Sequence, residues 1–305
     1  MVEPRLRELA LVRQILGLGE HSNVKYEDDG WDSRVYLVNG GEAVFKFPRS
    51  PETKMQYQRE VRVLDAVQTI DSPILIPLLE WRGPDLQWFG YKGIVGKQLS
   101  SCLSGLDADA KRSVGRQLGV FLRKLHTCRF EDIPVNSVEN EIAQYQEKYR
   151  LAVPALDELT AIERRVTQSF FFDVLPHKLR ELGGELRVTH GDLGPWNIIL
   201  TDHHQLGVID FGDVSYQDPS KDFSGFGDET ILAAALAAYG ADDWLREKAW
   251  LRIKAFPILD VPFYLGKGDL PGMQACLELV RRLIVRGEVS AARRVHTANS
   301  DTPGF

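Results

Sequence analysis

The first hundred residues change from a helical to an alternating pattern of apolar positions. In the first twenty residues the apolar positions recur at helical spacing: Leu6, Leu9, Val12 and Leu16. Residues 33–38 and 42–47 then alternate between apolar and polar side chains around an Asn-Gly-Gly turn, which predicts a β-hairpin. A helical pattern over 52–70 follows, and then two strand-like segments, 74–83 and 86–96. These patterns predict an N-terminal part that is rich in strands and contains one long internal helix.

The remainder of the chain has mostly helical periodicity. Helices are predicted over residues 106–128, 137–150, 156–182 and about 228–286. Two short apolar runs, in the segments HGDLGPWNIIL and GVIDFGD, interrupt them and are predicted to be strands. The whole pattern predicts an α+β fold with a β-rich N-terminal lobe over residues 1–96 and a mainly helical C-terminal lobe over 97–305. We expect a short connector between the lobes at about 92–97.

Composition and charge narrow the class of protein. The chain has 305 residues with a net charge of −6, from 37 basic and 43 acidic residues, which argues against a nucleic-acid partner. Its three cysteines lie far apart and form no zinc or disulfide pattern, so we expect free thiols in a reducing cytoplasm. The charged N-terminus lacks the apolar core of a signal peptide, and no apolar segment is long enough to span a membrane. We expect the last eight residues to be disordered.

Acidic and amide side chains accompany both short strands. Asp192 and Asn197 stand five positions apart in HGDLGPWNIIL, and Asp210 begins an Asp-Phe-Gly sequence after the second strand. Kinases place an Asp-x-x-x-x-Asn loop and an Asp-Phe-Gly segment in this order, after a strand lysine and a helix glutamate. Lys46 in AVFKFP and Glu60 in QREVRVL supply those two residues. The sequence therefore contains all the parts of a phosphoryl-transfer site in the expected order.

Each residue has a defined task in that chemistry. Lys46 would bind the nucleotide phosphates and Glu60 would hold the lysine in place. Asn197 and Asp210 would bind Mg²⁺ through oxygen ligands, which this cation prefers. Asp192 would orient the attacking hydroxyl or accept its proton. A lone strand lysine, helix glutamate or Asp-Phe-Gly has an ordinary structural explanation, so the inference depends on their joint occurrence.

The segments VTHGDLGPWNIIL and GVIDFGDVSYQDPSKDF together resemble the aminoglycoside phosphotransferase family, which carries Gly where Gly191 stands and protein kinases have Arg. The upstream segments YLVNGGEAVFKFPR, GYKGIVGKQLS and LGVFLRKLH look like the 2″-phosphorylating branch in particular. The resemblance extends over about residues 25–225. It implies a two-lobed, protein-kinase-like fold.

The resemblance also implies an activity. The chain would transfer the γ-phosphate of ATP or GTP, with Mg²⁺, to a hydroxyl of an aminoglycoside, the 2″-hydroxyl being the best candidate, as an antibiotic-resistance enzyme. The same fold with another small acceptor, such as a macrolide, a sugar or an amino alcohol, remains an alternative. A nucleotide-binding pseudokinase is a third reading, which the complete set of catalytic residues disfavours. We expect a monomer or a weak dimer.

Several further residues are candidates for nucleotide contacts. The chain lacks a Gly-x-Gly-x-x-Gly loop and has only Gly30 in the corresponding turn, where Ser33 could donate to a phosphate. The backbone of the connector, including Gly93 and Val95, would face the nucleotide base, and the bulky Tyr91 could favour ATP over GTP. No Ala-Pro-Glu segment follows the Asp-Phe-Gly, which argues against a protein kinase.

In the family, acidic residues of the C-terminal lobe bind a cationic aminosugar. The acidic candidates for this task are Asp213, Asp218, Asp222, Asp228 and Glu229. An ammonium about 4 Å from a carboxylate gains roughly 4 kcal/mol at an effective dielectric near 20, before desolvation. Alternatively, Asp218 and Asp222 cap a turn and brace the catalytic loop, and Asp228 is a helix N-cap.

An aromatic residue and four histidines accompany these motifs. Trp196, beside Asn197, would either border the acceptor pocket or pack on the C-terminal lobe. We expect His190 to bond backbone groups of the catalytic loop and His126 to pack against or cap a helix. We expect His203 and His204 to be solvated in the turn between the short strands.

Overall fold

The computed structural model describes residues 4–27 and 32–287, which divide into two compact units. Of the described residues, the first unit contains 4–27, 32–99 and 197–214, and the second contains 100–196 and 215–287. Residues 197–214, which carry two of the predicted metal ligands, are thus grouped with the N-terminal sheet, whereas the sequence boundary assigned them to the C-terminal lobe. The predicted tail and Gly30 lie outside the described residues.

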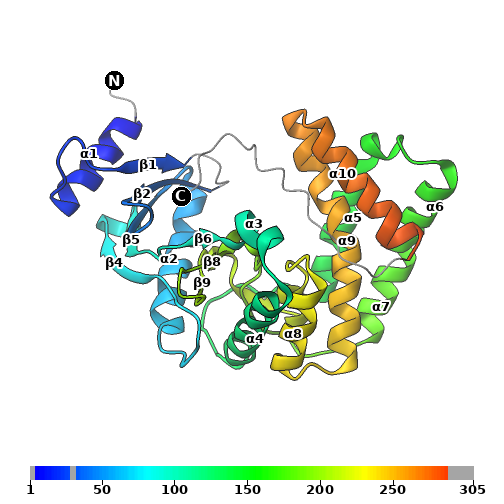
Figure 1. Ribbon diagram of the computed structural model, residues 1–305. Helices are drawn as coiled ribbons and strands as arrows, with labels where there is room; N and C mark the ends of the chain where they lie inside the picture. Colours follow the sequence, from blue (N-terminus) through cyan, green and yellow to red (C-terminus); the bar gives the residue numbers. More distant parts are fainter. Residues whose placement is uncertain (1–3, 28–31, 288–305) are drawn as a thin grey trace. The chain divides into compact units, whose positions relative to one another are not determined.

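A five-stranded antiparallel sheet forms the centre of the first unit, with strand order β1-β2-β3-β5-β4 (Figure 1). Its strands are β1 (Val24–Glu27), β2 (Ser33–Val38), β3 (Ala43–Pro48), β4 (Leu78–Arg82) and β5 (Phe89–Lys92). The predicted hairpin is β2–β3, and the turn needs Asn-Gly-Gly because all three residues have positive φ angles, of 49°, 70° and 100°. β4 is shorter than predicted: it begins only after Pro77, which has no N–H to donate to a ladder.

The two faces of the sheet have different roles. Helix α1 (Pro4–Leu16) buries Val12 against one face, where Tyr36, Phe45 and Phe47 form an apolar cluster. Lys46 lies between Phe45 and Phe47 on β3, so the alternation of a strand directs its side chain to the opposite face. Helix α2 (Pro51–Val67), which begins at the N-cap Ser50, supplies Glu60 as a buried partner.

A small three-stranded sheet completes the first unit, in the order β6-β8-β9. Its strands are β6 (Lys97–Gln98), β8 (Ile198–Leu200) and β9 (Leu206–Val208). β8 and β9 are the two predicted short strands and pair as an antiparallel hairpin. Leu75, which the sequence placed in a longer strand, forms a single bridge to Gly207 of β9.

The second unit is mostly helical, as predicted. Its helices are α4 (Ala108–Leu125), α5 (Val138–Leu156), α6 (Ala161–Ser169), α7 (Leu175–Glu181), α8 (Glu229–Tyr239), α9 (Asp243–Lys267) and α10 (Leu270–Val280), and the short α3 (Leu99–Cys102) precedes them. Its strands, β7 (Arg187–Thr189) and β10 (Ser215–Gln217), pair with each other. Helices α5, α9 and α10 contribute side chains to an apolar core cluster of this unit.

Two local features shape this unit. The segment predicted as one helical stretch over 156–182 starts a new helix at the capping box of Thr160 and Glu163, and a π-turn, Phe170–Val174, joins α6 to α7. Helices α4 and α8 approach closely because Gly115 and Gly119 have no side chain: an added Cβ would lie 2.4 and 2.2 Å from carbonyl oxygens of α8. Within the described ranges, no helix is long and apolar enough to cross a membrane.

Candidate active site

The ion pair predicted from the sequence is present in the first unit. The Lys46 ammonium donates to both carboxylate oxygens of Glu60, at 2.8 and 2.9 Å, and to Oδ1 of Asp210 at 3.0 Å. Lys46 and Glu60 are both buried, whereas the Asp210 side chain is 52% exposed. The lysine thus joins a strand, a helix and the Asp-Phe-Gly segment, which is 164 residues further along the chain.

Two carboxylates share this single ammonium, and this contact shifts the pKa values of Lys46 and Glu60. Burial alone would lower the pKa of Lys46, but the charges of Asp210 and Glu60 raise it well above its ordinary value. Burial raises the pKa of Glu60 to about 7, with Lys46 opposing the shift and Asp210 adding to it. Lys46 is therefore cationic at neutral pH, and Glu60 titrates near pH 7.

We expect the Glu60 carboxyl to make folding stability depend on pH. Its pKa is about 7 in the folded chain and near 4.5 when unfolded, so between these values the folded state holds a proton that the unfolded state has lost. The free energy of unfolding should therefore fall as pH rises from about 4.5 through about 7, by an amount on the order of 1–3 kcal/mol.

Urea denaturation of the wild type and of Glu60→Gln at pH 5 and pH 8 measures this contribution. The Gln variant should lose the dependence assigned to Glu60, while Glu80→Gln, a change at an exposed residue of β4, should keep it. Equal pH dependence in the wild type and Glu60→Gln would contradict the assignment.

The hairpin of β8 and β9 brings the two predicted metal ligands to one end of the small sheet. The Ile209 N–H donates to the Asn197 carbonyl at 3.0 Å, so Asp210 follows directly after the residue that pairs with Asn197. Asp210 has a left-handed conformation (φ 65°, ψ 72°), an uncommon one for a residue other than glycine. Arg59 of α2 holds the segment in place through bonds of 2.6 and 3.2 Å to the Gly212 carbonyl. No sequence motif pointed to Arg59.

The donor set at this end of the sheet fits a magnesium ion. An amide oxygen of Asn197 and the half-exposed carboxylate of Asp210 are hard oxygen ligands, and Mg²⁺ commonly takes one or two such protein ligands while nucleotide phosphates supply others. Across the part of the chain that the structure describes, no group of three or more His, Cys, Asp or Glu residues could hold a metal by itself.

Residues of the predicted catalytic loop, in the second unit, are held by buried and partly buried hydrogen bonds. His190 is fully buried, and its Nδ1 accepts a hydrogen bond from the Asp192 N–H at 3.4 Å, the backbone contact expected for this histidine. The Asp222 carboxylate accepts the N–H groups of His190 and Gly191 at 2.8 and 3.0 Å. Gly191 needs its glycine because its φ is 86°.

Asp222 in turn has a partner that the sequence did not identify. His126 is the C-cap of α4, which is one of the two roles expected for it from the sequence. Its ring also lies between Asp222 and Tyr239. Its Nε2 is 3.1 Å from Asp222 Oδ2 and its Nδ1 is 2.9 Å from the Tyr239 hydroxyl. Although burial alone would raise it, the hydrogen bond from His126 and neighbouring charges hold the pKa of Asp222 below its ordinary value. Asp222 therefore braces the loop as an anion, as the alternative reading of the sequence proposed.

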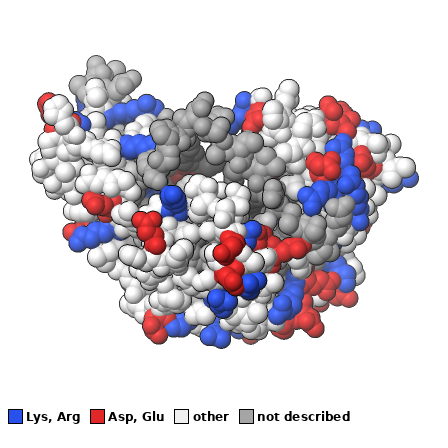
Figure 2. All heavy atoms as spheres, viewed as in Figure 1, with Lys and Arg blue, Asp and Glu red and all other residues white. Residues whose placement is uncertain are grey.

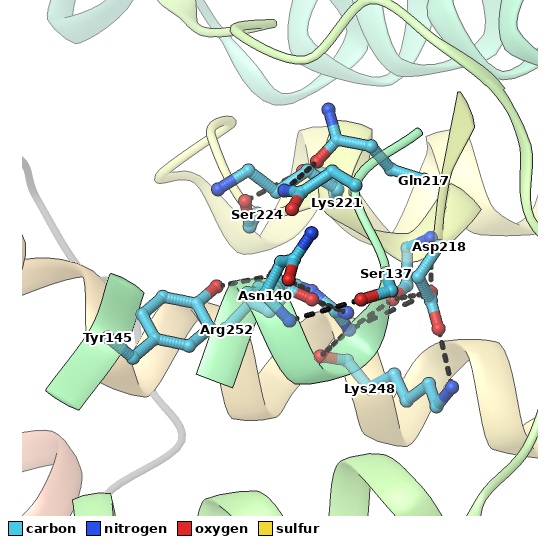
Figure 3. Close-up of polar contacts among 12 residues, drawn as sticks. Ser137, Asn140, Tyr145, Gln217, Asp218, Lys221, Ser224, Lys248 and Arg252 are labelled. Carbon is cyan, nitrogen blue, oxygen red and sulfur yellow. Dashed lines mark hydrogen bonds and ion pairs between the residues drawn. The ribbon is translucent and has the colours of Figure 1, made fainter. Parts of the chain in front are cut away.

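A second buried network contacts the start of the same short helix, Pro219–Phe223 (Figure 3). Lys248 and Arg252 of α9 are completely buried. Lys248 bonds the Asp218 carboxylate at 2.5 Å and also the Gly183 carbonyl. Arg252 makes a two-point ion pair with Glu141, at 2.8 and 2.5 Å, and donates to the Ser220 hydroxyl at 2.6 Å. Asp218 is thus engaged in structural contacts, and the sequence held no signal for Lys248 or Arg252.

The predicted acceptor residues have different surroundings. Asp228 is the N-cap of α8: one oxygen accepts the N–H groups of Thr230 and Ile231, and the other pairs with Lys111 at 2.9 Å. Asp213 is exposed and Glu229 is half-buried. The Trp196 indole donates to Asp192 Oδ2 at 3.1 Å. His203 and His204 are exposed in the turn between β8 and β9, where solvated side chains were expected.

The predicted nucleotide-contact residues belong to the first unit. Ser33 is buried at the start of β2, and its hydroxyl accepts a hydrogen bond of 2.7 Å from Tyr57 of α2. The Gly93 N–H donates to the Glu42 carbonyl at 2.9 Å, and a Cβ at this position would lie 1.9 Å from the Gly41 carbonyl. Val95 is 56% exposed, whereas Tyr91 of β5 is buried. Their contacts with a nucleotide remain predictions.

Comparison with known proteins identifies the class to which this fold and these residues belong. Residues 25–255 match the phosphotransferase enzyme family (APH), so the chain belongs to this family of phosphotransferases. Similar solved structures include the GDP complex of a wild-type aminoglycoside 2'-phosphotransferase-IIIa, with 21% identity, a TM-score of 0.69 and coverage of 93% of this chain and 100% of that one.

Two other solved structures carry different small molecules or none. The streptomycin–ATP ternary complex of APH(2″)-IIa is 19% identical, with a TM-score of 0.64 and coverage of 92% of this chain and 99% of that one. The apoenzyme of macrolide 2'-phosphotransferase MphH from Brachybacterium faecium is 20% identical, with a TM-score of 0.61 and coverage of 90% and 97%. At these identities the likeness establishes the kinase-like α+β fold.

Proposed function

We propose that this chain transfers the γ-phosphate of ATP or GTP to a hydroxyl group of an aminoglycoside, with the 2″-hydroxyl as the preferred acceptor. The observation that carries the proposal is the contact of the buried Lys46 ammonium with both Glu60 and Asp210. This arrangement presents one fixed cation beside a half-exposed acid. Phosphoryl transfer requires both groups, whereas a purely structural ion pair does not require a half-exposed acid. Membership of the phosphotransferase family supports it independently.

The reaction assigns one task to each of these residues. The acceptor oxygen forms a bond to the γ-phosphorus while the bond from that phosphorus to the bridging oxygen breaks, and the nucleoside diphosphate leaves. Lys46 binds phosphate oxygens and Glu60 keeps its ammonium in position. Asp192 orients the hydroxyl and takes up its proton. Asn197 and Asp210 would hold Mg²⁺, which neutralises phosphate charge when bound.

The N-terminal part to about residue 96 would bind the nucleotide, with the connector at about 92–97 facing the base and Ser33 near the phosphates. The part from residue 97 would supply the catalytic loop and the acceptor site, including Asp213, Asp228, Glu229 and Trp196. Because Asp228 already caps α8 and pairs with Lys111, an acceptor ammonium would have to share its carboxylate. The three cysteines are free thiols, and the donors are cytoplasmic nucleotides, so we place the activity in the cytoplasm.

A macrolide is the second candidate acceptor. The structure of macrolide 2'-phosphotransferase MphH matches this chain over 90% of its length, with a TM-score close to those of the aminoglycoside enzymes. The face shown in Figure 2 carries both acidic and basic side chains. The choice between the two acceptors therefore depends on experiment.

A panel of acceptors tests the proposal. Purified protein with Mg²⁺ and either ATP or GTP is mixed with aminoglycosides that have or lack a 2″-hydroxyl, a macrolide, a simple sugar and an amino alcohol. We expect nucleoside diphosphate release that depends on the 2″-hydroxyl, with the phosphorylated product identified by mass spectrometry. Nucleotide binding without turnover for any acceptor would indicate a pseudokinase and refute the proposal.

The metal assignment predicts a shift in magnesium dependence. Asp210→Asn keeps an oxygen ligand but removes its charge, so the Mg²⁺ concentration for half-maximal rate should rise about tenfold or more. Turnover at saturating Mg²⁺ should fall as well, while circular dichroism remains that of the wild type. Asp202→Asn, in the exposed turn after β8, is the matched control. An unchanged Mg²⁺ requirement in Asp210→Asn would refute this role.

A further inference from the structure

The contact between Trp196 and Asp192 lies within one short stretch of the catalytic loop. The indole Nε1–H donates to Asp192 Oδ2 at 3.1 Å across four positions of sequence. Asp192 is exposed and Trp196 is half-buried, so the bond lies where solvent and an acceptor can reach the carboxylate. Smaller side chains could donate one hydrogen bond, so the large indole ring suggests that the position of the donor matters.

Gly194 is what allows the ring to take this position. A Cβ built on Gly194 would lie only 2.1 Å from two atoms of the Trp196 six-membered ring, so the indole lies directly against the backbone of the loop. The φ angle of Gly194 is not positive, so the requirement for glycine here is space and not backbone conformation.

The loop is also packed on the side of Gly225, where an added Cβ would meet the Leu193 carbonyl at 2.0 Å. The backbone that carries Asp192 and Trp196 is therefore in close contact with ring atoms at one residue and with chain backbone at another. Movement of the indole toward Gly194 would therefore need movement of this backbone.

We propose that Trp196 is a positioning residue that fixes the plane of the Asp192 carboxylate for proton acceptance. Gly194 leaves the space that the indole ring occupies. This inference rests on the proposed function. Rotation of an aspartate about χ2 is soft, so a carboxylate without a directional partner samples many orientations. A donor on Oδ2 selects one of them.

The chemistry of indole suits this task. The Trp nitrogen donates a hydrogen bond but neither accepts one nor takes up a proton. It therefore orients the carboxylate without adding a second base beside it. It also adds no positive charge that would pair with the anion and compete for the acceptor or for phosphate oxygens. In this position a histidine would add a second base, and a lysine would add a positive charge.

The test removes the N–H and keeps an aromatic ring. Because a hydrogen bond to a charged group is worth more than a neutral one, Trp196→Phe should lower kcat by about tenfold. The KM values for nucleotide and acceptor should stay within about twofold of the wild type. Gly194→Ala, which displaces the ring, should give the same pattern. Trp250→Phe on α9 makes the same chemical change elsewhere and should leave both constants unchanged.

A double-mutant cycle then separates positioning from packing. In an Asp192→Asn background no base remains to be oriented, so adding Trp196→Phe should lower kcat by less than twofold. A further tenfold loss of kcat in the Asp192→Asn background would overturn the inference. So would a Trp196→Phe single variant whose kcat is unchanged or whose only effect is a higher acceptor KM. In each of these cases acceptor-dependent turnover by the wild type would still support the proposed function. Absence of acceptor-dependent turnover in the wild type would overturn both.

Discussion

Asp192→Asn is expected to lower turnover by about 10²–10⁴-fold, which is the usual contribution of a general base. The amide keeps the shape of the side chain and can still accept the Trp196 hydrogen bond, so the loop should keep its structure. The substituted group is no longer a base. Since phosphate binding is assigned to Lys46 and metal binding to Asn197 and Asp210, the KM for nucleotide should change little.

Steady-state kinetics with the best acceptor, together with nucleotide binding measured by calorimetry, decide this prediction. Glu229→Gln, which alters another acid of the second unit, is a useful comparison because it should affect mainly the acceptor KM if that residue contacts the substrate. If Asp192→Asn loses nucleotide affinity in proportion to rate, Asp192 is a metal or structural residue.

Glu141→Ala is expected to lower the free energy of unfolding by about 3–5 kcal/mol, because it leaves a buried charge without its partner. The Arg252 guanidinium has no exposed surface and makes its two-point contact with this carboxylate. Burial alone would raise the pKa of Glu141, but Arg252 holds it below its ordinary value, so the pair is ionised at neutral pH. Ser220 and the more distant Asp218 are poor replacements for a bidentate partner.

Urea denaturation at pH 7 measures this loss, and the same helix offers a matched control. Glu139 of α5 also makes a two-point contact with an arginine, Arg180, at 2.7 Å, but both side chains are more than half exposed. Solvent screens this pair, so Glu139→Ala should lower the free energy of unfolding far less than Glu141→Ala does. If the two variants lose the same stability, burial is not what makes the Glu141 pair important.

The short helix Pro219–Phe223 links these two predictions. Asp218 at its start is held by Lys248 of α9, and Asp222, four residues on, holds the backbone of His190 and Gly191. The stability of the buried charge network therefore also sets how firmly the second unit holds its catalytic loop. Variants of Glu141 that remain folded are expected to show a lower kcat than their stability alone would explain.

The sequence by itself determined the local structure and the principal chemistry. The Asn-Gly-Gly turn specified the β2–β3 hairpin because few other residues adopt three successive positive φ angles. The alternation of β3 placed Lys46 on the face opposite Phe45 and Phe47, and the helical pattern after Pro51 supplied Glu60. These signals depend only on neighbouring residues, so they can be read along the chain.

Tertiary structure alone decided which distant groups meet. His126, Lys248 and Arg252 carry no local signal, because a buried histidine, lysine or arginine looks in sequence like one on the surface. Their partners, Asp222, Asp218 and Glu141, lie between 30 and 111 residues away. Long-range contacts of this kind depend on how elements pack together, which the local pattern of apolar and polar residues does not specify.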